Sequence, residues 1–330
     1  MRPSAKTLLL AAKLPAVLIT EPVNVRYLTG FKGDSASVLA LPSGFILFAD
    51  SLEYEAARSQ KRKGVRLQTK ERGFPEKMAT VKQCGFEGWG VTFPMLARWK
   101  KQFKNTKFVQ TLELVEGFRR NKDAQELKTM DYAHNITKEL LRHIPTLLKP
   151  GVTERETAWQ IETMARSLGA DCMSFETIVA FGTHTSRPHH HPTDRKLRKG
   201  QLVQIDLGAT YHGYCSDRSA VFFTGKPTPR EQLVLKALEE ALAAGKAAVK
   251  AGAPCSAPDK AARKVLTRYK LQRFFTHSVG HGVGLDIHEG VVLHERSKDL
   301  LLKNEVVTIE PGVYFPGKFG MRLEEMIIVK

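Results

Sequence analysis

The sequence is poor in cysteine, and its cysteines lack the spacing that thiolate chemistry requires. The 330 residues contain four cysteines, and no two of them form a Cys-x-x-Cys pair. This pattern argues against a disulfide framework and against a zinc site built from thiolates, and it is typical of a reducing compartment. We therefore interpret the cysteines as free thiols: Cys84, Cys172, Cys215 and Cys255.

Long apolar stretches are also missing. A membrane-spanning helix needs about 20 consecutive apolar residues, and no segment reaches that length. The segment Met1–Thr20 looks like a signal peptide at first sight, but Lys13 and Pro15 interrupt its apolar run and no clear cleavage site follows. We predict a short helix and then a strand there, and we expect a cytoplasmic protein that does not enter a membrane.

Acidic residues are scarce relative to basic ones. The 51 Lys and Arg against 34 Asp and Glu give a net charge of +17, which raises the possibility of an acidic partner. The basic clusters at Lys61–Arg66 and Lys100–Lys107 lack the interleaved aromatics of nucleic-acid surfaces, apart from Trp99 and Phe103. We interpret both clusters as solvated surface, and nucleic-acid binding is the less favoured alternative.

The length fits two globular domains, and 42% hydrophobic with 26% charged residues is ordinary for such proteins. The charged segment Arg119–Lys122 looks like a boundary, so we predict domains at 1–118 and 119–330. The first domain reads as α/β. Its predicted strands and helices are Ala16–Thr20, Ser37–Leu41, Phe45–Ala49, Ser51–Ser59, Pro75–Gln83 and Pro94–Phe103.

The second domain repeats one arrangement twice. A long amphipathic helix is predicted over Asp123–Leu148, and another begins at Thr153, where Glu156 completes a capping box. The same box recurs at Thr228 with Glu231, before a further helical pattern at Pro258–Tyr269. The order of elements is two helices, strands, two helices and strands. This order predicts an internally duplicated α+β domain whose sheet is covered by helices on one face.

The stretch on which the chemistry depends reads as a β-hairpin carrying two aspartates. Its arms are Leu202–Gly208 and Tyr214–Phe223, and the turn falls near Tyr211–Gly213. That turn would set Asp206 opposite Asp217, at a Cβ separation of roughly 5 Å on one face. Carboxylates that close repel one another unless protons or cations neutralise them. Taken alone, two solvent-facing aspartates are an equally good interpretation.

Three later segments add ligand-type side chains. Two of the carboxylates stand in or beside apolar, strand-like runs, where an ionised group is costly unless it is paired. A surface or salt-bridge role is open for each carboxylate separately, but two Asp, two Glu and one His together suit two divalent ions. The candidates in these segments are His277, His281, His288, Glu310 and Glu324.

Several motifs resemble, in order, those of the pita-bread metallopeptidases (family M24), which include methionine aminopeptidase, Xaa-Pro aminopeptidase and Xaa-Pro dipeptidase (prolidase). They are DLGATYHGYCSD, HSVGHGVGLDIHE, TIEPGVY and MRLEE. Asn24–Phe31 resembles the NxRYLTGF segment of the creatinase/prolidase-type N-terminal domain, and Pro188–Leu197 is similar to PHxxPxDRxL of the Xaa-Pro enzymes. The resemblance implies a creatinase-type α/β domain followed by a pita-bread catalytic domain.

The resemblance also implies roles for the five ligand candidates. Asp206 would chelate one metal ion, Asp217 and Glu324 would bridge both ions, and His281 with Glu310 would complete the second. Glu310 would also shuttle a proton from the attacking water to the leaving nitrogen. Mn²⁺ is the expected metal, with Co²⁺, Fe²⁺ or Zn²⁺ as alternatives.

The histidines divide into two groups. By the resemblance, His189 and His288 would act on the substrate side, His288 stabilising the oxyanion or orienting the carbonyl, and His277 would line the proline-side pocket. The resemblance gives no role to His190 and His191, which we expect in an exposed loop.

The implied activity is hydrolysis of the Xaa-Pro bond at the N-terminus of peptides. Xaa-Pro dipeptidase is the alternative, and a non-catalytic pita-bread binding protein is a third possibility. Proline-containing peptides and a second copy of the chain are the expected partners. The sequence departs from the family after Asp217, where Ser219-Ala220-Val221 replaces the usual Thr-Arg-Thr, so that an arginine is lost but a hydroxyl is kept.

Overall fold

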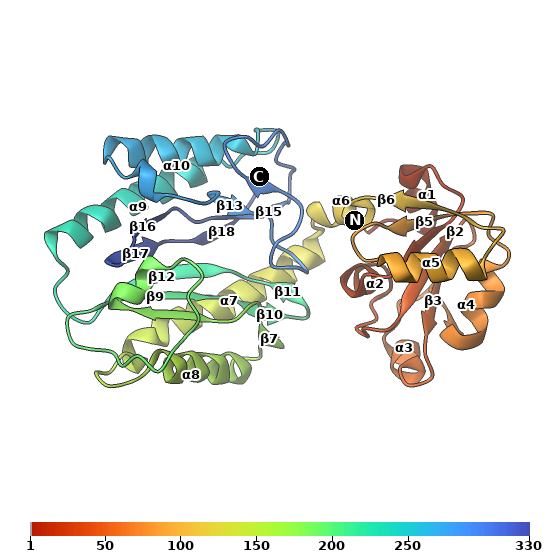
Figure 1. The fold of residues 1–330 in the computed structure, drawn as a ribbon, viewed down its shortest axis with the longest axis horizontal. Coiled ribbons are helices and arrows are strands. Elements are labelled where there is room, and N and C mark those ends of the chain that lie inside the picture. The colour runs from red at the N-terminus through yellow and green to blue at the C-terminus, as the bar shows by residue number, and fades with distance from the viewer. Residues whose placement is uncertain (1) are drawn as a thin grey trace. The chain divides into compact units, whose positions relative to one another are not determined.

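A computed structural model describes residues 2–330. The chain folds into two compact units, one ending at Arg119 and the other covering Arg120–Lys330 (Figure 1). No helix within residues 2–330 combines the length and the apolar character that crossing a membrane requires. The four cysteines are free, and only Cys172 is exposed.

The first unit is built on a six-stranded mixed sheet with the order β4-β3-β2-β1-β5-β6. Neighbours β1, β2 and β3 run antiparallel, and the remaining pairs are parallel. The strands are β1 (Val17–Ile19), β2 (Ser37–Leu41), β3 (Gly44–Ala49), β4 (Arg66–Thr69), β5 (Gln83–Glu87) and β6 (Lys107–Thr111). The helices are α1 (Ala5–Ala12), α2 (Pro22–Thr29), α3 (Tyr54–Gln60), α4 (Lys70–Met78), α5 (Phe93–Gln102) and α6 (Leu114–Arg120).

The three strands predicted for this unit are confirmed as β1, β2 and β3, and the outer two predicted helices overlap α3 and α5. The helix predicted over Pro75–Gln83 is wrong in register. Helix α4 begins earlier and packs Phe74 and Met78 against the core. The chain then turns, and Gln83 begins β5.

The second unit has the predicted alternation of helix pairs and strand groups. The first half holds α7 (Ala124–Leu147), α8 (Glu154–Ser167), β7 (Cys172–Met173), β8 (Ile178–Phe181), the 3-10 helix η1 (Gly182–Ser186), β9 (Leu202–Leu207), β10 (Ala209–Tyr211), β11 (Tyr214–Cys215) and β12 (Arg218–Phe223). The second half holds α9 (Pro229–Ala247), α10 (Ser256–Arg268), the 3-10 helix η2 (Gln272–Phe274), β13 (Gly280–His281), β14 (Val292–Leu293), β15 (Val306–Ile309), β16 (Gly312–Phe315), β17 (Phe319–Arg322) and β18 (Glu325–Ile328).

Capping boxes begin three of these helices. The predicted boxes at Thr153 and Thr228 are confirmed, and Asp123 with Glu126 forms a third at the start of α7. Each box satisfies backbone N–H groups that have no partner within the helix. The caps therefore fix where α7, α8 and α9 start.

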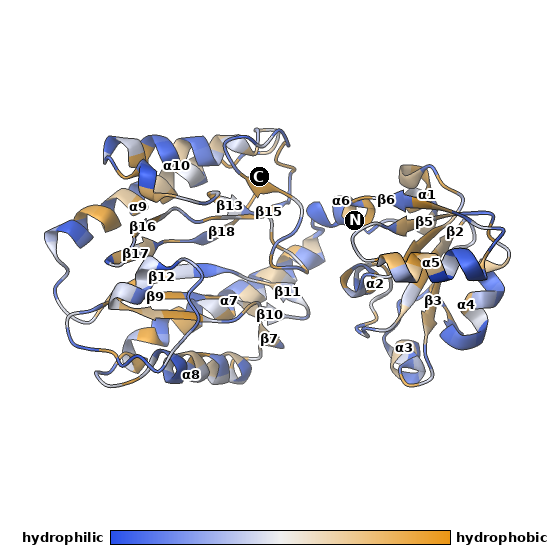
Figure 2. Ribbon diagram, in the orientation of Figure 1, coloured by the Kyte–Doolittle hydropathy of each residue, from blue (hydrophilic) through white to orange (hydrophobic). Residues whose placement is uncertain are grey.

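Each half of this unit has its own apolar core. Leu140, Ile161 and Phe181 belong to the core beneath α7 and α8, and Leu238, Leu266 and Ile309 belong to the core beneath α9 and α10. In Figure 1, α8 lies along the lower side of the strands and α10 along the upper side. In Figure 2 hydrophilic and hydrophobic residues are interleaved along helices such as α8, α9 and α10, as expected for elements that bury one face.

Single hydrogen bonds join strands of this unit that do not pair in a continuous ladder. The strands of this unit form five small sheets, where we expected a single covered one. The Gln204 side chain replaces a ladder between β9 and β17, because its Nε2 donates to Arg322 O at 3.1 Å and its Oε1 accepts from Arg322 N at 2.8 Å. The Glu324 N–H donates to Ser219 O at 3.2 Å, which ties the segment before β18 to β12.

The predicted hairpin is confirmed, but its register differs by two residues. Asp206 pairs with Ser219 and not with Asp217, which lies just before β12. The turn is the tight pair His212-Gly213, whose φ values of 45° and 78° are those of a two-residue hairpin loop. Since successive strand residues alternate between faces, a shift of two keeps Asp217 on the same face as Asp206.

Helix α10 holds the chain that leads into β13. The Asp259 carboxylate is fully buried, accepts the Val279 N–H at 3.0 Å and pairs with Arg263 at 2.7 Å. Arg263 in turn donates to the carbonyls of Phe275 and His277, at 3.2 and 2.7 Å. This pair therefore satisfies backbone groups on both sides of His277.

We expect Asp259→Ala to lower the free energy of unfolding of the metal-free protein by about 3–5 kcal/mol, since it leaves a charge and an N–H without their partner. Urea denaturation in the presence of a chelator measures this. Arg268→Ala, which removes an exposed ion pair from the same helix, is the control and should cost less than about 1 kcal/mol. Equal losses in the two variants would contradict the proposed bracing role of Asp259.

Candidate active site

One cavity in the second unit gathers all the side chains that the sequence singles out. Its volume is about 500 Å³, and both halves of the unit contribute to its wall. The predicted residues that line it are His189, Asp206, Asp217, His277, His281, His288, Glu310 and Glu324.

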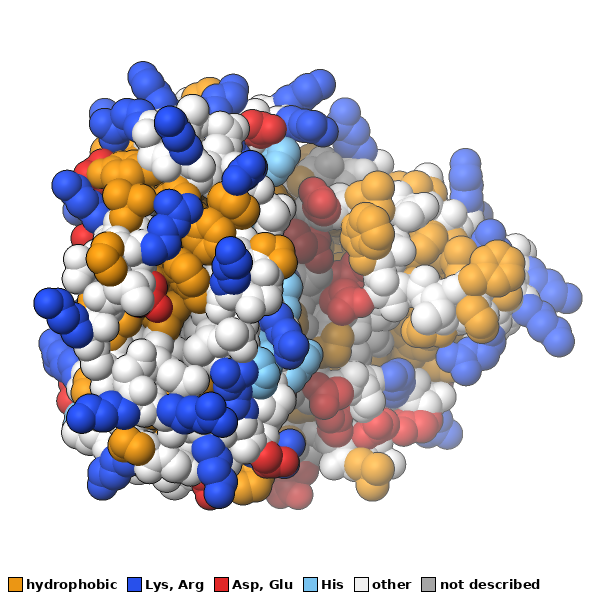
Figure 3. Space-filling model, turned by 60° about the vertical axis from the view of Figure 1, so that its left-hand side comes forward, with side chains coloured by type: hydrophobic (Ala, Val, Ile, Leu, Met, Phe, Trp, Pro, Cys, Tyr) orange, Lys and Arg blue, Asp and Glu red, His pale blue; other side chains and the backbone are white. Residues whose placement is uncertain are grey.

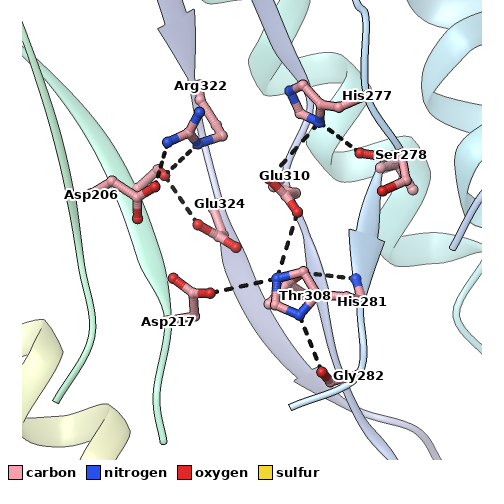
Figure 4. A network of polar contacts seen from close by, with 12 residues as sticks. Asp206, Asp217, His277, Ser278, His281, Gly282, Thr308, Glu310, Arg322 and Glu324 are labelled. Carbon is pink, nitrogen blue, oxygen red and sulfur yellow. Dashed lines mark hydrogen bonds and ion pairs between the residues drawn. The ribbon is translucent and has the colours of Figure 1, made fainter. Parts of the chain in front are cut away.

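The five ligand candidates stand on strands or at strand ends. Asp206 lies in β9 and Asp217 directly precedes β12. His281 ends β13, Glu310 directly follows β15, and Glu324 lies between β17 and β18. Figure 4 shows the five side chains pointing toward one another from these strands. Hydrogen-bonded strands hold such groups more rigidly than loops would.

The distances within this cluster suit a shared cation. Asp217, His281 and Glu324 each offer one ligand atom, and the three atoms lie within 4.8 Å of one another. His281 Nε2 lies 3.6 Å from Asp217 Oδ2 and 3.7 Å from Glu310 Oε1. His281 Nδ1–H donates to Gly282 O at 3.1 Å, which leaves the Nε2 lone pair directed at the carboxylates.

The carboxylates repel one another in a largely buried setting. Burial raises the pKa of Asp217 well above its ordinary value, and the charges of Glu324, Asp206 and Glu310 raise it further. Burial likewise raises the pKa of Glu324, with Glu310 and Asp206 adding to the effect. Burial raises the pKa of Glu310 to about 8. A cation bound among them would relieve this cost.

Two oxygens in the cluster are left without partners by the protein. Asp206 Oδ1 and Asp217 Oδ1 are buried and accept no hydrogen bond. Unpaired buried acceptors are rare in proteins, and oxygen-rich sets with an imidazole suit divalent ions. The residues present therefore fit a metal centre.

Arg322 is a site residue that the sequence reasoning missed. Its buried guanidinium pairs with Asp206 Oδ2 and donates to Tyr314 Oη at 2.7 Å and to Ser219 Oγ at 2.9 Å. It also donates to Pro188 O, in the segment before His189. The available signal was a lone cation two residues before Glu324, since alternate residues of a strand share a face.

The departure from the Thr-Arg-Thr pattern leaves the contacts of the ligand candidates intact. Ser219 Oγ donates to Glu324 Oε2 at 3.0 Å, so the retained hydroxyl contacts a ligand candidate, as expected. Ala220, where the arginine is lost, pairs with Ile205 and lies on the opposite face of β12. Loss of that arginine therefore removes no contact from the face that carries Asp206.

Burial disfavours the charged form of three histidines beside the cluster. Burial lowers the pKa of His277 and of His281 to about 4, and burial also lowers the pKa of His288. The His288 ring meets the His281 ring edge-on, with centroids 4.2 Å apart. His277 Nε2 lies 3.2 Å from Tyr314 Oη. Neutral imidazoles can donate hydrogen bonds to a substrate without adding charge.

One expectation about the histidine run is wrong. His190 is buried, with 4% of its surface exposed, and its Nε2 lies 2.9 Å from Glu154 Oε2. The buried carboxylate of α8 draws this part of the loop inward. His191 is exposed as expected and pairs with Glu176 at 2.8 Å.

Apolar side chains form part of the cavity wall beside the polar cluster. They are Phe175, Ile178, Pro188, Ile287 and Val292. Pockets that combine an apolar wall with a few convergent polar groups are typical ligand sites. This wall suits a small apolar ring or side chain placed next to the carboxylates.

Comparison with known proteins agrees with this geometry. The model of metallopeptidase family M24 matches residues 128–330, and that of the creatinase/prolidase N-terminal domain matches residues 2–120. The uncharacterized peptidase YqhT of Bacillus subtilis is 33% identical over 96% of this chain and 91% of its own length. A putative Xaa-Pro aminopeptidase of Mycoplasma genitalium is 32% identical over 98% of this chain and 92% of its own.

A solved structure shares the fold. The Xaa-Pro dipeptidase from Bacillus anthracis superposes with a TM-score of 0.94 and 31% identity, covering 99% of this chain and 94% of that one. The chain therefore belongs to metallopeptidase family M24, with a creatinase/prolidase-type N-terminal domain ahead of a pita-bread catalytic domain.

Proposed function

We propose that the protein is a dinuclear metallopeptidase that hydrolyses the Xaa-Pro bond at the N-terminus of peptides. The observation that carries this is the cluster of four carboxylates and His281 beside an apolar wall in one cavity. The names of the relatives support the substrate class, since they include an Xaa-Pro aminopeptidase and an Xaa-Pro dipeptidase. Xaa-Pro dipeptidase activity is the second candidate.

The proposed ligands divide between two ions. Asp206 would hold one ion, His281 and Glu310 the other, and Asp217 and Glu324 would bridge them. Two divalent ions would supply an activated water as nucleophile and an electrophile for the scissile carbonyl. Oxygen-rich ligands favour Mn²⁺, and the single imidazole leaves Co²⁺, Fe²⁺ and Zn²⁺ possible.

The other residues act on the substrate and its protons. Glu310 accepts the proton of the attacking water and delivers it to the prolyl nitrogen as the bond breaks. A carboxylate placed beside the attacking water suits both steps. His288 and His189 donate toward the carbonyl oxygen, where negative charge develops. His277, held by Tyr314 and Ser278, lines the pocket for the proline ring.

The apolar wall accounts for proline recognition. An Xaa-Pro bond has no N–H, so a site cannot recognise it through that donor. Phe175, Ile178 and Ile287 offer the ring an apolar surface instead. We further propose that the protein is cytoplasmic and acts as a homodimer.

Nucleic-acid binding remains the weaker candidate, and it rests on the net charge of +17. Figure 3 shows Lys and Arg side chains spread over a face of the second unit instead of gathered in one strip. A dispersed charge fits a solvated surface better than a strand-tracking groove. Retention on a nucleic-acid column at moderate salt would favour the weaker candidate.

A matched pair of substrates tests the reaction and its class. We expect Mn²⁺-loaded protein to cleave an Xaa-Pro-Yaa tripeptide, releasing the first residue, and the chelated protein to be inactive. Release of free proline, followed by chromatography, from an Xaa-Pro dipeptide alone would instead assign a dipeptidase. Failure to cleave either peptide with Mn²⁺, Co²⁺, Fe²⁺ and Zn²⁺ would contradict the peptidase proposal.

Removing a bridging carboxylate should abolish both metal retention and turnover. We expect Asp217→Ala to lose bound metal, measured by elemental analysis. Since the metal-activated water would be lost with the metal, kcat/KM should fall at least about 1,000-fold. Asp194→Ala, at an exposed pair with Arg155, is the control and should match wild type. Full activity in Asp217→Ala would refute the dinuclear assignment.

Arg322 should act by orienting Asp206. Lysine keeps the charge but cannot reach Asp206, Ser219 and Tyr314 together. We expect Arg322→Lys to weaken metal binding by about 10–100-fold, the usual effect of losing a group that orients a ligand. Calorimetric titration with Mn²⁺ measures it. Arg218→Lys, at a half-exposed pair with Glu325, should bind normally, and equal losses would rule out the orienting role.

A further inference from the structure

A second group of metal-ligating side chains lies on the α8 side of the catalytic unit. Glu154, His184 and His190 each offer one ligand atom, and these atoms lie within 4.8 Å of one another. Glu154 Oε1 is 2.9 Å from His184 Nδ1, and Glu154 Oε2 is 2.9 Å from His190 Nε2. The two rings lie 4.5 Å apart, centroid to centroid. None of the three residues is assigned a role in the dinuclear centre.

The Glu154 carboxylate is held in place from behind. Its side chain is fully buried, and it accepts the N–H of Phe181 at 2.8 Å and both the N–H and hydroxyl of Thr193, at 3.1 and 2.6 Å. These bonds hold the carboxylate with Oε1 facing His184 and Oε2 facing His190. Ligating carboxylates in metal sites are typically oriented by such outer hydrogen bonds.

We propose that Glu154, His184 and His190 form a third metal site, which binds Zn²⁺. One carboxylate and two imidazoles are the ligand set of open zinc sites, in contrast to the oxygen-rich dinuclear centre. Ligand atoms around a tetrahedral zinc at about 2.0–2.1 Å lie roughly 3.3 Å apart, so the 2.9 Å contacts need to open only slightly. On binding, each ring turns a lone pair to the ion and carries its proton on the other nitrogen.

A fourth ligand can reach this site from solvent. His184 lines a surface cavity of about 540 Å³ together with Arg195, Lys196 and Arg198. These cations favour an anionic fourth ligand, such as hydroxide or a small carboxylate, over water. The open position is typical of zinc sites with three protein ligands.

Zinc here would fasten the loop that carries a substrate-side histidine. Glu154 begins α8, His184 lies in η1, and His190 follows His189 directly. Both His189 and His190 line the catalytic cavity. The ion would thereby fix the backbone next to His189. Zinc binding at this site does not depend on peptidase activity.

Zinc binding can be measured separately from the dinuclear centre. In the Asp217→Asn/Glu324→Gln variant, which loses two mutually repelling bridging carboxylates, we expect one zinc per chain by elemental analysis after dialysis. Adding His184→Ala or His190→Ala should weaken that binding at least about 100-fold, more than loss of an outer partner does. His191→Ala, the exposed neighbour, is the matched control and should bind normally.

Two results would overturn the site. Absence of bound zinc from the folded double variant would leave only a hydrogen-bonded His-Glu-His cluster, and zinc that survives His184→Ala would place the ion elsewhere. If circular dichroism shows the double variant unfolded, the wild type and His184→Ala are compared instead, and their zinc content should differ by one ion per chain. Thr193→Val, which keeps all three ligands, should weaken zinc binding by about 10–100-fold. An unchanged zinc affinity in this variant would contradict the role of Thr193 in orienting the Glu154 carboxylate.

Discussion

Mutual repulsion among four carboxylates, of which Asp206, Asp217 and Glu324 are buried, is the constraint around which the catalytic unit is built. Asp217 and Glu324 carry pKa values raised by burial and by their neighbours, and two aspartate oxygens have no protein partner. No packing of apolar groups can relieve such a cost, whereas cations can. Arg322 supplies one positive charge at Asp206. The remaining negative charge makes the arrangement stable chiefly as a receptor for metal ions.

Much of this site could be predicted from the sequence, for identifiable reasons. Polar residues interrupting apolar strand patterns located Asp206, Glu310 and Glu324, and the hairpin was visible from its two apolar arms. Its register was not, because the tight His212-Gly213 turn cannot be told from a longer one by composition alone. The two-residue shift changed the partner of Asp206 to Ser219 but kept both aspartates on one face.

The parts that could not be predicted depend on contacts between distant segments. Arg322 is recognisable only once β17 lies beside β9, and His190 only once its loop folds onto the start of α8. In each case the local sequence looks like ordinary surface: a lone cation in a strand and a histidine in a polar run. Helix α4 shows the same limit, since its bounds depend on core contacts of Phe74 and Met78 that the local sequence does not reveal.

The duplicated architecture has a consequence for when the protein becomes reactive. The first half contributes Asp206 and Asp217, and the second contributes His281, Glu310 and Glu324. Neither half holds a full ligand set, and Glu324 comes last in chain order. The five proposed ligands therefore come together only when the last strands of the second half lie beside β9, and a fragment that ends before Glu324 lacks one of the two proposed bridging carboxylates.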